Sequence, residues 1–503
     1  MLAIVQFDAA SARVLARLLG DGRLPVLAGL RDRGTWHDLE APATQFAAGA
    51  QHTLYSGHPL ESHGLFYPFQ WSAAEQRARY MGDLYAPPPV WEQLGTTGGR
   101  TLAVDPYESR PPEGPTVGTQ VCGWQLHDRV VLRRWDRPEG IHERLRDTFG
   151  EPEVVDEVFG THTVTEMLAL RRRLLGAPAR VADATTLFLR EQRYDLAWTT
   201  FCAAHVAGHQ FWDLSQLDPD QLDDSSSHLL ATTLEDVYAA VDAALGRIVA
   251  ALAPGDDLLV LSPVGMDVNT SRADMLPEML RAILEPGWSQ ATAPMSGIWK
   301  LRAALPSDLR AKVGGMLPEQ FALDLTSRLE MRGFDWSRTR AFAHPAENQG
   351  YIRLNLKGRE RDGIVDPAHA PALLDEIAAG VATFTDLDGG AAVASVQRVA
   401  DLFPSGDRAH QLPDLIVGWT DRPATNLDGV TSERYGTIRR HGVGSGRSGN
   451  HTNGDAWAIV VPGSSRPAAL GRRPRLEDIA ATALVLSGGD PSATAGEPLL
   501  LPA

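Results

Sequence analysis

Short apolar runs of strand length recur along the chain, and stretches with helical spacing lie between them. The first run is Leu2–Phe7, which ends at Asp8 and is followed by a predicted helix, Ala10–Leu19. Farther on, the amphipathic stretch His228–Leu252 lies between the runs Leu196–Phe201 and Leu258–Leu261. Alternating strands and helices favour a parallel sheet that is covered on both faces. We therefore predict an α/β fold with a doubly wound, mostly parallel sheet.

Further elements fit the same order. Pro25 at the start of an apolar, helix-forming stretch is typical of a helix N-terminus, and a Gly-Gly pair at 488–489 is typical of a helix end. The additional predicted helices and strands are the helices Leu24–Arg33, Val90–Leu94 and Leu476–Leu486, and the strands Thr101–Val104 and Ala456–Val461.

Two stretches differ in composition and pattern from the α/β repeat. Residues 107–180 are rich in Arg, Pro and Glu, and residues 296–440 contain an alternating strand, Tyr351–Leu356, and a helix, Ala370–Phe384. We expect one domain over residues 1–503, with an insertion at 107–180, a cap inserted at 296–440, and a return to the core at 441–503.

Composition limits the partners and the compartment. The 503 residues carry a formal charge of −16, so no general attraction to nucleic acid or to an anionic membrane is expected. Cys122 and Cys202 are the only cysteines, too few for a disulfide framework. No apolar run approaches the length of a membrane span, and the chain enters a strand at once without a leader segment. A cytoplasmic protein is the expectation.

Several potential metal ligands follow predicted strands. Asp8 stands at the carboxyl end of the first strand, where open α/β sheets bind their ligands. His205 and His209 follow the strand Leu196–Phe201 with a spacing of four residues, which places two imidazoles on one face of a helical turn. Packed or hydrogen-bonded histidines are the alternative interpretation of this common spacing. Cys202, three residues before His205, is a minor candidate ligand.

A glycine-rich segment before the strand Ala456–Val461 carries one more histidine, His451, which would complete a set of three imidazoles. Such a segment either brings backbone close to a ligand or forms a mobile loop. Arg439, Arg440 and Arg447 could neutralise a small anionic substrate, and a solvated arginine surface is the alternative.

The segment Thr53–Gly64 resembles the TG-x-x-P-x-x-HG element of the alkaline phosphatase superfamily, in its type I phosphodiesterase/nucleotide pyrophosphatase branch. The resemblance extends through Val90–Leu94, Asp195–Trp212, Arg353–Glu360 and the C-terminal Gly449-Asn450-His451. It implies an alkaline phosphatase-like fold with an inserted cap subdomain. It also implies a site with two zinc-like ions and a Ser/Thr nucleophile that attacks a phosphate or sulfate ester.

The resemblance assigns Asp8 to one metal site and His209 and His451 to the other. The third ligand of the second site, an Asp in the family, is His205 here. The family's SDHG motif is replaced by Ser262-Pro263-Val264-Gly265, so an Asp and a His of the first site are missing. Counting back from His63-Gly64, the nucleophile position falls on Ala47, and Thr44 could replace it only with three inserted residues.

These departures predict one divalent transition metal instead of two. Three imidazoles suit zinc, with iron or copper as alternatives, and leave an open coordination position. Asp8 is then a candidate base or orienting group, with Asp267 as a helper.

The leading hypothesis is a mononuclear metal-dependent enzyme that hydrolyses or transfers a phosphate- or sulfate-type ester or anhydride. A catalytically inactive relative that binds a ligand or partner in the old cleft, and a biosynthetic enzyme with non-hydrolytic chemistry, are the alternatives.

Overall fold

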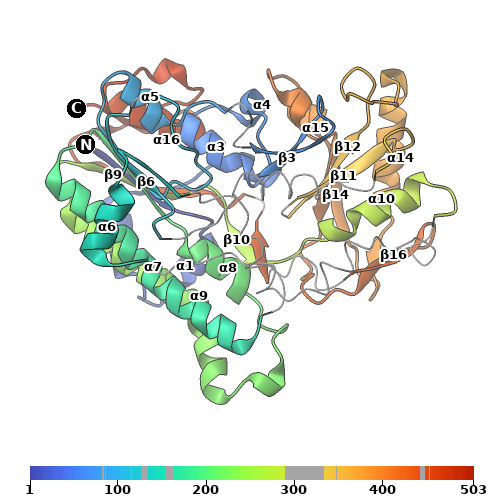
Figure 1. The fold of residues 1–503 in the computed structure, drawn as a ribbon, viewed down its shortest axis with the longest axis horizontal. Helices are drawn as coiled ribbons and strands as arrows, with labels where there is room; N and C mark the ends of the chain where they lie inside the picture. Colours follow the sequence, from blue (N-terminus) through green and yellow to red (C-terminus); the bar gives the residue numbers. More distant parts are fainter. Residues whose placement is uncertain are drawn as a thin grey trace.

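The computed structural model describes residues 1–81, 84, 86–114, 116–125, 134–152, 162–288, 334–346, 348–441, 448–452 and 454–503. Its main body is an eight-stranded sheet in the order β2-β19-β9-β1-β8-β5-β6-β7, with helices on both faces (Figure 1). The strands of this sheet are β1 (Leu2–Phe7), β2 (Thr35–Asp38), β5 (Thr101–Val104), β6 (Gly118–Cys122), β7 (Trp135–Arg137), β8 (Leu196–Phe201), β9 (Asp257–Ser262) and β19 (Trp457–Val461).

The centre of the sheet is parallel and fully buried. β1 pairs in parallel with β8 on one side and with β9 on the other, and β5 and β6 continue the parallel order beyond β8. Every residue of β1, β8 and β9 is buried. Burial on both faces explains why these strands are apolar runs without alternation. Parallel pairing also brings the carboxyl ends of β1 and β8 to the same edge of the sheet.

Helices cover the two faces of the sheet separately. Ala3, Val5 and Phe7 of β1 belong to the core under one helical layer, whereas Leu2 and Ile4 belong to the core under the other. Figure 1 shows the two layers on opposite sides of the strands. The first layer contains α1 (Ala12–Gly20), α2 (Pro25–Arg33), α6 (Ile141–Phe149), α7 (Val164–Glu191), α8 (Ala203–Phe211) and α9 (Asp224–Ala251), and the second contains α3 (Gly49–Ser56), α5 (Val90–Thr96) and α16 (Glu477–Leu486).

A second lobe lies beside the carboxyl edge of the sheet and has its own apolar core (Figure 1). A four-stranded antiparallel sheet, β11-β12-β15-β14, and a three-stranded sheet, β13-β16-β17, form its framework. Its elements are α10 (Leu276–Leu284), β11 (Ala341–His344), β12 (Gly350–Leu354), α14 (Ala370–Val381), β13 (Thr385–Asp386), β14 (Val393–Arg398), α15 (Val399–Leu402), β15 (Leu415–Trp419), β16 (Gly429–Ser432) and β17 (Gly436–Arg439).

Short elements connect the two lobes and close the chain ends. The hairpin of β3 and β4 packs against Phe342 of the second lobe, and β10 pairs with β18 beside α8. The remaining elements are α4 (Leu60–His63), β3 (Phe69–Ser72), β4 (Arg77–Tyr80), β10 (Met266–Val268), β18 (Gly449–His451), β20 (Arg466–Pro467), β21 (Leu500–Leu501) and the 3₁₀ turns η1 (Pro42–Thr44), η3 (Pro219–Gln221), η4 (Ala273–Met275), η5 (Pro367–His369), η6 (Ala409–Gln411) and η7 (Pro491–Ala493).

The segment boundaries differ in part from the sequence expectation. Residues 107–180, expected as an insertion, instead supply β6 and β7 to the central sheet and α6 and most of α7 to its helical layer. The second lobe begins before residue 296, because α10 packs in the same core as β11. Residues 289–333 lie outside the described part of the chain. The segment 441–503 includes β19 and α16 of the main body.

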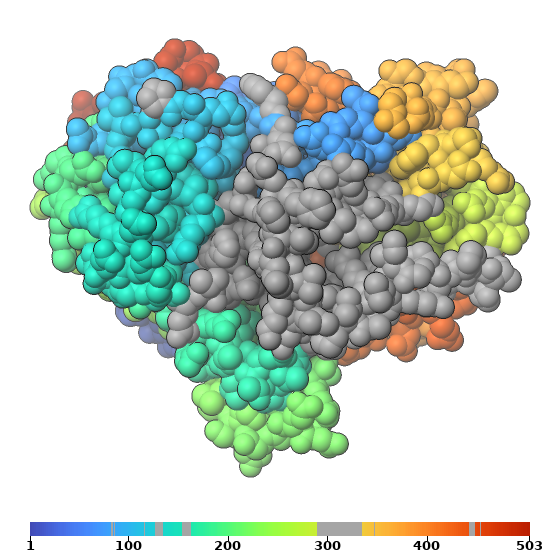
Figure 2. Space-filling model, viewed as in Figure 1, coloured from blue at the N-terminus to red at the C-terminus, as the bar shows by residue number. Residues whose placement is uncertain are grey.

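Helices form the main projection from the surface of the molecule. The N-terminal ends of α7 and α9, with the segment between α8 and α9, project from the lower edge in Figures 1 and 2. The two chain termini lie near each other at the far end of the main body (Figure 1). Among the described residues, no helix combines the length and apolar character needed to cross a bilayer.

The start of α2 is capped from another helix. Its N-cap residue Leu24 offers no capping side chain, and the carboxylate of Asp242 on α9 accepts from the backbone N–H groups of Val26 (3.0 Å) and Leu27 (2.8 Å). A carboxylate there satisfies exposed donors and favours the positive end of the helix. This contact links the start of α2 to α9 within the helical layer that packs on Ala3, Val5 and Phe7 of β1.

We predict that Asp242→Ala lowers the free energy of unfolding by about 1–2 kcal/mol, because two helix-terminal donors lose their acceptor. Urea denaturation measures this change. The matched control is Asp220→Ala, at an exposed position of η3, which should change stability by less than about 0.5 kcal/mol. Equal effects of the two substitutions would contradict the capping role.

Candidate metal centre

Two of the candidate ligands come from one short helix. α8 begins directly after β8, and it carries His205 and His209 four residues apart, both buried. Small residues let this helix approach its neighbours closely: a Cβ on Gly208 would lie 2.5 Å from the Cγ of Met266 on β10. His205 and His209 therefore lie about one helical turn apart on α8, as the spacing of four residues predicted.

The third imidazole is brought in by the strand pair of β10 and β18. In this antiparallel pair Met266 lies opposite His451. β18 also packs on α8: the N–H of Ser448 donates to the carbonyl of His209 (2.7 Å), and a Cβ on Gly449 would lie only 2.1 Å from the carbonyl oxygen of Gly208. The strand can approach the helix this closely because residue 449 has no side chain.

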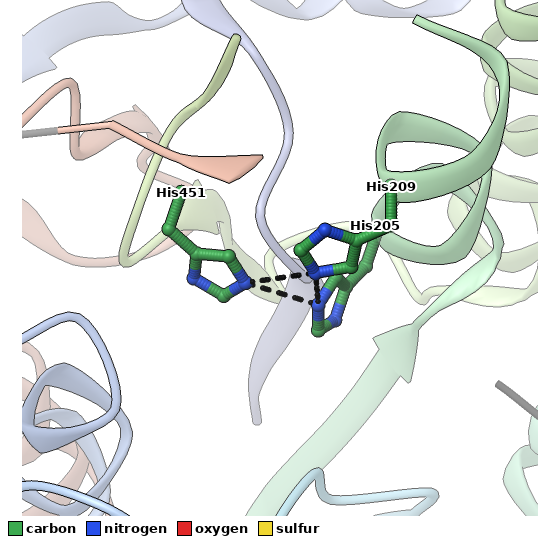
Figure 3. Close-up of side chains that lie close together, drawn as sticks. All are labelled: His205, His209 and His451. Carbon is green, nitrogen blue, oxygen red and sulfur yellow. Dashed lines mark hydrogen bonds between the residues drawn. The ribbon is translucent and has the colours of Figure 1, made fainter. Parts of the chain in front are cut away.

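The three rings converge through the same atom of each. The Nε2 atoms of His205 and His209 lie 2.8 Å apart, and the Nε2 of His451 lies 3.1 Å from that of His205 and 3.2 Å from that of His209 (Figure 3). All three side chains are buried. We call His205, His209 and His451 the three-imidazole centre.

Hydrogen bonds at the opposite ring nitrogens assign the tautomers of two of these histidines. The Nδ1 of His205 lies 2.6 Å from Oδ2 of Asp8, and the Nδ1 of His209 lies 2.9 Å from the carbonyl oxygen of Gly449. A carboxylate and a carbonyl only accept, so each Nδ1 carries the proton. In a ring with its proton on Nδ1, the lone pair is on Nε2, and the Nε2 atoms of these two rings face each other.

The geometry of the three-imidazole centre suits a shared cation. A shared proton can bridge only one pair of the three nitrogens, whereas a metal ion interacts with all three lone pairs at once. The donor set and its carboxylate-backed histidine have the composition of a protein site for one transition-metal ion.

Asp8 lies behind the three-imidazole centre. Its Oδ2 accepts from His205, and its Oδ1 accepts from the side-chain amide of Gln51 on α3 (2.6 Å). The group of side chains close enough to share an ion consists, among the described residues, of the three histidines without Asp8. The arrangement suits Asp8 to an orienting role and not to direct coordination.

Backbone strain accumulates around the centre. Ala9, directly after Asp8, has φ +49°, and Asp105 and Glu108, which follow β5, have φ +52° and +54°. The ring of Tyr107 between them contacts the ring of His205 edge to face, with centroids 5.1 Å apart. Positive φ at non-glycine residues is costly and tends to occur where a surrounding structure holds a functional site.

The two residues that the resemblance puts at the nucleophile and at the SDHG histidine are apolar here. Ala47 and Val264 are buried in one core cluster. Ser262 forms backbone hydrogen bonds instead, accepting from the N–H of Ala10 and donating to the carbonyl of Val264 (both 2.9 Å). We call the six buried side chains of this region the apolar wall: Ala9, Ala43, Ala47, Ala50, Val264 and Met266.

Other predicted site residues have contacts of their own. Thr44 is exposed at the end of η1, and its hydroxyl donates to the carbonyl of Ala41 (3.4 Å). Asp267 forms an ion pair with Arg13. Burial, and next the charge of Asp8, raises the pKa of the Cys202 thiol, which disfavours the thiolate that a metal ligand would require.

The three predicted substrate-binding arginines have different surroundings. The guanidinium of Arg440 donates to both carboxylate oxygens of Asp274 (2.8 and 3.0 Å) and to backbone carbonyls of the second lobe, so it holds that lobe together. Arg439 is exposed at the end of β17. Arg447 lies outside the described residues. Substrate binding by Arg439, Arg440 and Arg447 stays a prediction.

The element Thr53–Gly64, which carries the family resemblance, forms a turn. The Nε2 of His63 lies 3.0 Å from the hydroxyl of Thr53, and its Nδ1 accepts from the N–H of Leu65 (3.0 Å). Gly57 ends α3 with φ +71°, and Gly64 ends α4 with φ +67°. Burial lowers the pKa of His63 well below its usual value, so this imidazole stays neutral. The element positions α3, which carries Gln51.

Sequence reasoning missed Gln6 and Gln51. Gln6 is a polar residue inside the otherwise apolar run of β1, and that exception is a signal that the sequence offered. Gln51 offers no comparable signal, because polar residues are ordinary on helices. Its contact with Asp8 depends on how α3 packs over the sheet.

Comparison with known protein families shows which family the chain belongs to. The model of the type I phosphodiesterase / nucleotide pyrophosphatase family matches residues 2–443. The chain therefore belongs to this family, whose members are hydrolytic enzymes of the phosphodiesterase and pyrophosphatase type. Comparison with curated protein sequences gave no match.

Solved structures confirm the alkaline phosphatase-like fold. Phosphonoacetate hydrolase from Sinorhizobium meliloti 1021 in complex with phosphonoformate is similar with a TM-score of 0.51 and 14% identity, over 97% of this chain and 95% of that one. Its complex with phosphonoacetate has a TM-score of 0.52 and 13% identity, with the same coverage. Murine ectonucleotide pyrophosphatase / phosphodiesterase 5 has a TM-score of 0.48 and 10% identity, over 99% of each chain.

We predict that Gly449→Ala separates β18 from α8, because the new Cβ would overlap the carbonyl oxygen of Gly208. The free energy of unfolding should fall by roughly 1–3 kcal/mol, as for other overpacked sites. A crystal structure of the variant should show His451 displaced from His209. The control is Gly471→Ala, where a Cβ would meet nothing within 4 Å. An unchanged His209–His451 separation in the Gly449 variant would contradict this packing account.

Proposed function

We propose that the protein is a metal-dependent enzyme with a single metal ion, which hydrolyses or transfers a phosphate- or sulfate-type ester or anhydride. The observation that carries the proposal is the convergence of three Nε2 atoms within 3.2 Å of one another on the fold of a phosphohydrolase family. Membership of the family supports the class of reaction, and the donor set supports the metal.

The donor set fits one transition-metal ion. Tetrahedral zinc with nitrogen ligands at about 2.0–2.1 Å requires nitrogens roughly 3.3 Å apart. The three separations of 2.8, 3.1 and 3.2 Å are only slightly shorter than this requirement. Three neutral imidazoles suit zinc, and iron or copper are the alternatives. Three protein ligands also leave a position open for a substrate oxygen.

A second ion does not fit the residues present. Two-metal hydrolysis uses several charged ligands around each ion. Pro263 and Val264 stand at the positions where the resemblance implies an Asp and a His, and the two oxygens of Asp8 accept hydrogen bonds from His205 and Gln51. Burying a cation against alanine, valine and methionine side chains would cost far more than it returns.

The roles of this chain's residues follow from their contacts. A bound ion would supply Lewis-acid polarisation of an ester oxygen. Asp8 and the carbonyl of Gly449 fix the orientation of two ligand rings, so their lone pairs point inward without reorganisation. Three neutral ligands leave the charge of a divalent ion uncompensated in the first shell, which favours a small anionic substrate.

Loss of the family's nucleophile favours a second candidate. Ala47 cannot form a covalent intermediate, so the cleft could bind a ligand or partner without turnover, or could support non-hydrolytic biosynthetic chemistry. The apolar wall supports this candidate as strongly as it supports a mononuclear hydrolase. Activity measurements separate the two.

We predict about one equivalent of transition metal per chain in purified protein, and less than about 0.1 equivalent in His209→Ala, which removes one of the three imidazole ligands. Inductively coupled plasma mass spectrometry measures both values. The matched control is His369→Ala, an exposed histidine of η5, which should retain the wild-type content. Two equivalents, or none after reconstitution with zinc, iron or copper, would refute the single-ion proposal.

We predict that the protein turns over an aryl phosphate monoester or diester and that a chelator abolishes this activity. Adding back one equivalent of zinc should restore it, and His209→Ala should lower kcat/KM by at least about 100-fold. Activity that persists in metal-free protein would exclude the proposed role of the ion. Stoichiometric metal with no turnover of any ester would favour the non-hydrolytic candidates.

A further inference from the structure

A chain of buried hydrogen bonds runs from the middle of the sheet to the three-imidazole centre. The indole N–H of Trp198 on β8 donates to Oε1 of Gln6 (3.1 Å), and Nε2 of Gln6 donates to Oε1 of Gln51 (2.9 Å). Nε2 of Gln51 then donates to Oδ1 of Asp8 (2.6 Å), whose other oxygen accepts from His205. We call Gln6 and Gln51 the amide relay.

The direction of every bond in this chain is fixed by its two ends. An indole N–H can only donate, and an ionised carboxylate can only accept. Each amide between Trp198 and Asp8 must therefore present its oxygen toward the indole and its nitrogen toward the carboxylate. If either amide group rotated by 180°, it would lose two hydrogen bonds. Water could not replace these bonds, because Gln6 is 0% and Gln51 is 3% exposed.

The relay acts on the oxygen of Asp8 that His205 does not use. A carboxylate at the end of the first strand could coordinate an ion directly, as the family resemblance implies. A short hydrogen bond from Gln51 holds Oδ1 and leaves Oδ2 directed at the Nδ1 of His205. Charge-assisted bonds of this length are among the stronger ones in proteins.

We propose that Gln51, supported by Gln6 and Trp198, is a positioning residue that holds Asp8 as the hydrogen-bond acceptor of His205 and so sets the affinity of the three-imidazole centre for its metal. This inference rests on the proposed function, because it requires a metal ion at the centre. It assigns a role to two glutamines that touch neither the ion nor a substrate. Partners of this kind typically change metal affinity by 10- to 100-fold when removed.

The test replaces Gln51 by methionine, which has similar length and lacks both hydrogen bonds. The control is Gln70→Met: Gln70 is also buried, accepts from the N–H of Phe66 (2.9 Å) and donates to the carbonyl of Gly64 (2.7 Å). Both substitutions leave buried polar groups unsatisfied, so both should destabilise the fold to a similar extent. Only the Gln51 variant should alter the metal centre.

Two readouts separate positioning from stability. Competition with a chromophoric chelator should give a zinc Kd about 10-fold higher for Gln51→Met than for wild type or Gln70→Met. The visible absorption bands of the cobalt-substituted protein should shift in the Gln51 variant and stay unchanged in the control. If Gln51→Met does not fold, Trp198→Phe is the second variant. It removes the first donor of the chain and keeps an aromatic side chain, and the zinc Kd of this variant should rise about twofold or more.

The outcomes are distinguishable from failure of the proposed function. If wild-type protein binds neither zinc nor cobalt, the single-ion proposal itself has failed. If wild type binds zinc and the Gln51 and Trp198 variants keep both its Kd and its cobalt spectrum, the relay has no positioning role and the inference is overturned. Equal weakening by Gln51→Met and Gln70→Met would also overturn it, because general destabilisation would then account for the effect.

Discussion

The hydrogen bond between Asp8 and His205 is the interaction on which the rest of the site depends. It joins the end of the first strand to the helix after β8, and it fixes the proton of His205 on Nδ1. The carbonyl of Gly449 accepts from Nδ1 of His209 in the same way, so the Nε2 atoms of the two rings are directed at one point. The parallel register of β1 and β8 makes this contact possible, because both strands end at the same edge of the sheet.

The same edge explains how this member of the family differs from the pattern that its sequence resembles. Ala47 and Val264 stand where the pattern has a nucleophile and a metal ligand, and both pack in the core with Ala9, Ala43, Ala50 and Met266. Buried apolar side chains stabilise the fold by roughly 25 cal/mol per Å² of surface removed from water, whereas a cluster of uncompensated carboxylates would destabilise it. The apolar side chains at these two positions therefore add to the packed core and require no cation there. Gln51 follows Ala50 of this wall on α3, and its side-chain amide donates to Asp8.

Much of the fold could be predicted, because burial on both faces leaves a strong signal. The strand Leu2–Phe7 was predicted with its observed bounds, and the helix expected at His228–Leu252 is α9, Asp224–Ala251. The strands β6 and β7, at one edge of the main sheet, were missed, since they are short and lie in a stretch whose Arg and Pro content hides their apolar residues. In the site, local spacing brought His205 and His209 together. Whether His451 joins them depends on the pairing of β10 with β18, which no local pattern encodes, and the position of Asp8 behind His205 depends on α3.

The central claim is that the three imidazoles hold one ion and that Asp8 stands outside its coordination sphere. Anomalous diffraction from crystals of metal-loaded protein, measured at the absorption edge of the bound metal, tests this claim most directly. The account predicts a single peak within bonding distance of Nε2 of His205, His209 and His451, with the carboxylate of Asp8 still on the Nδ1 of His205. A second peak beside Asp8 and the apolar wall, or a single ion coordinated by Asp8, would contradict it.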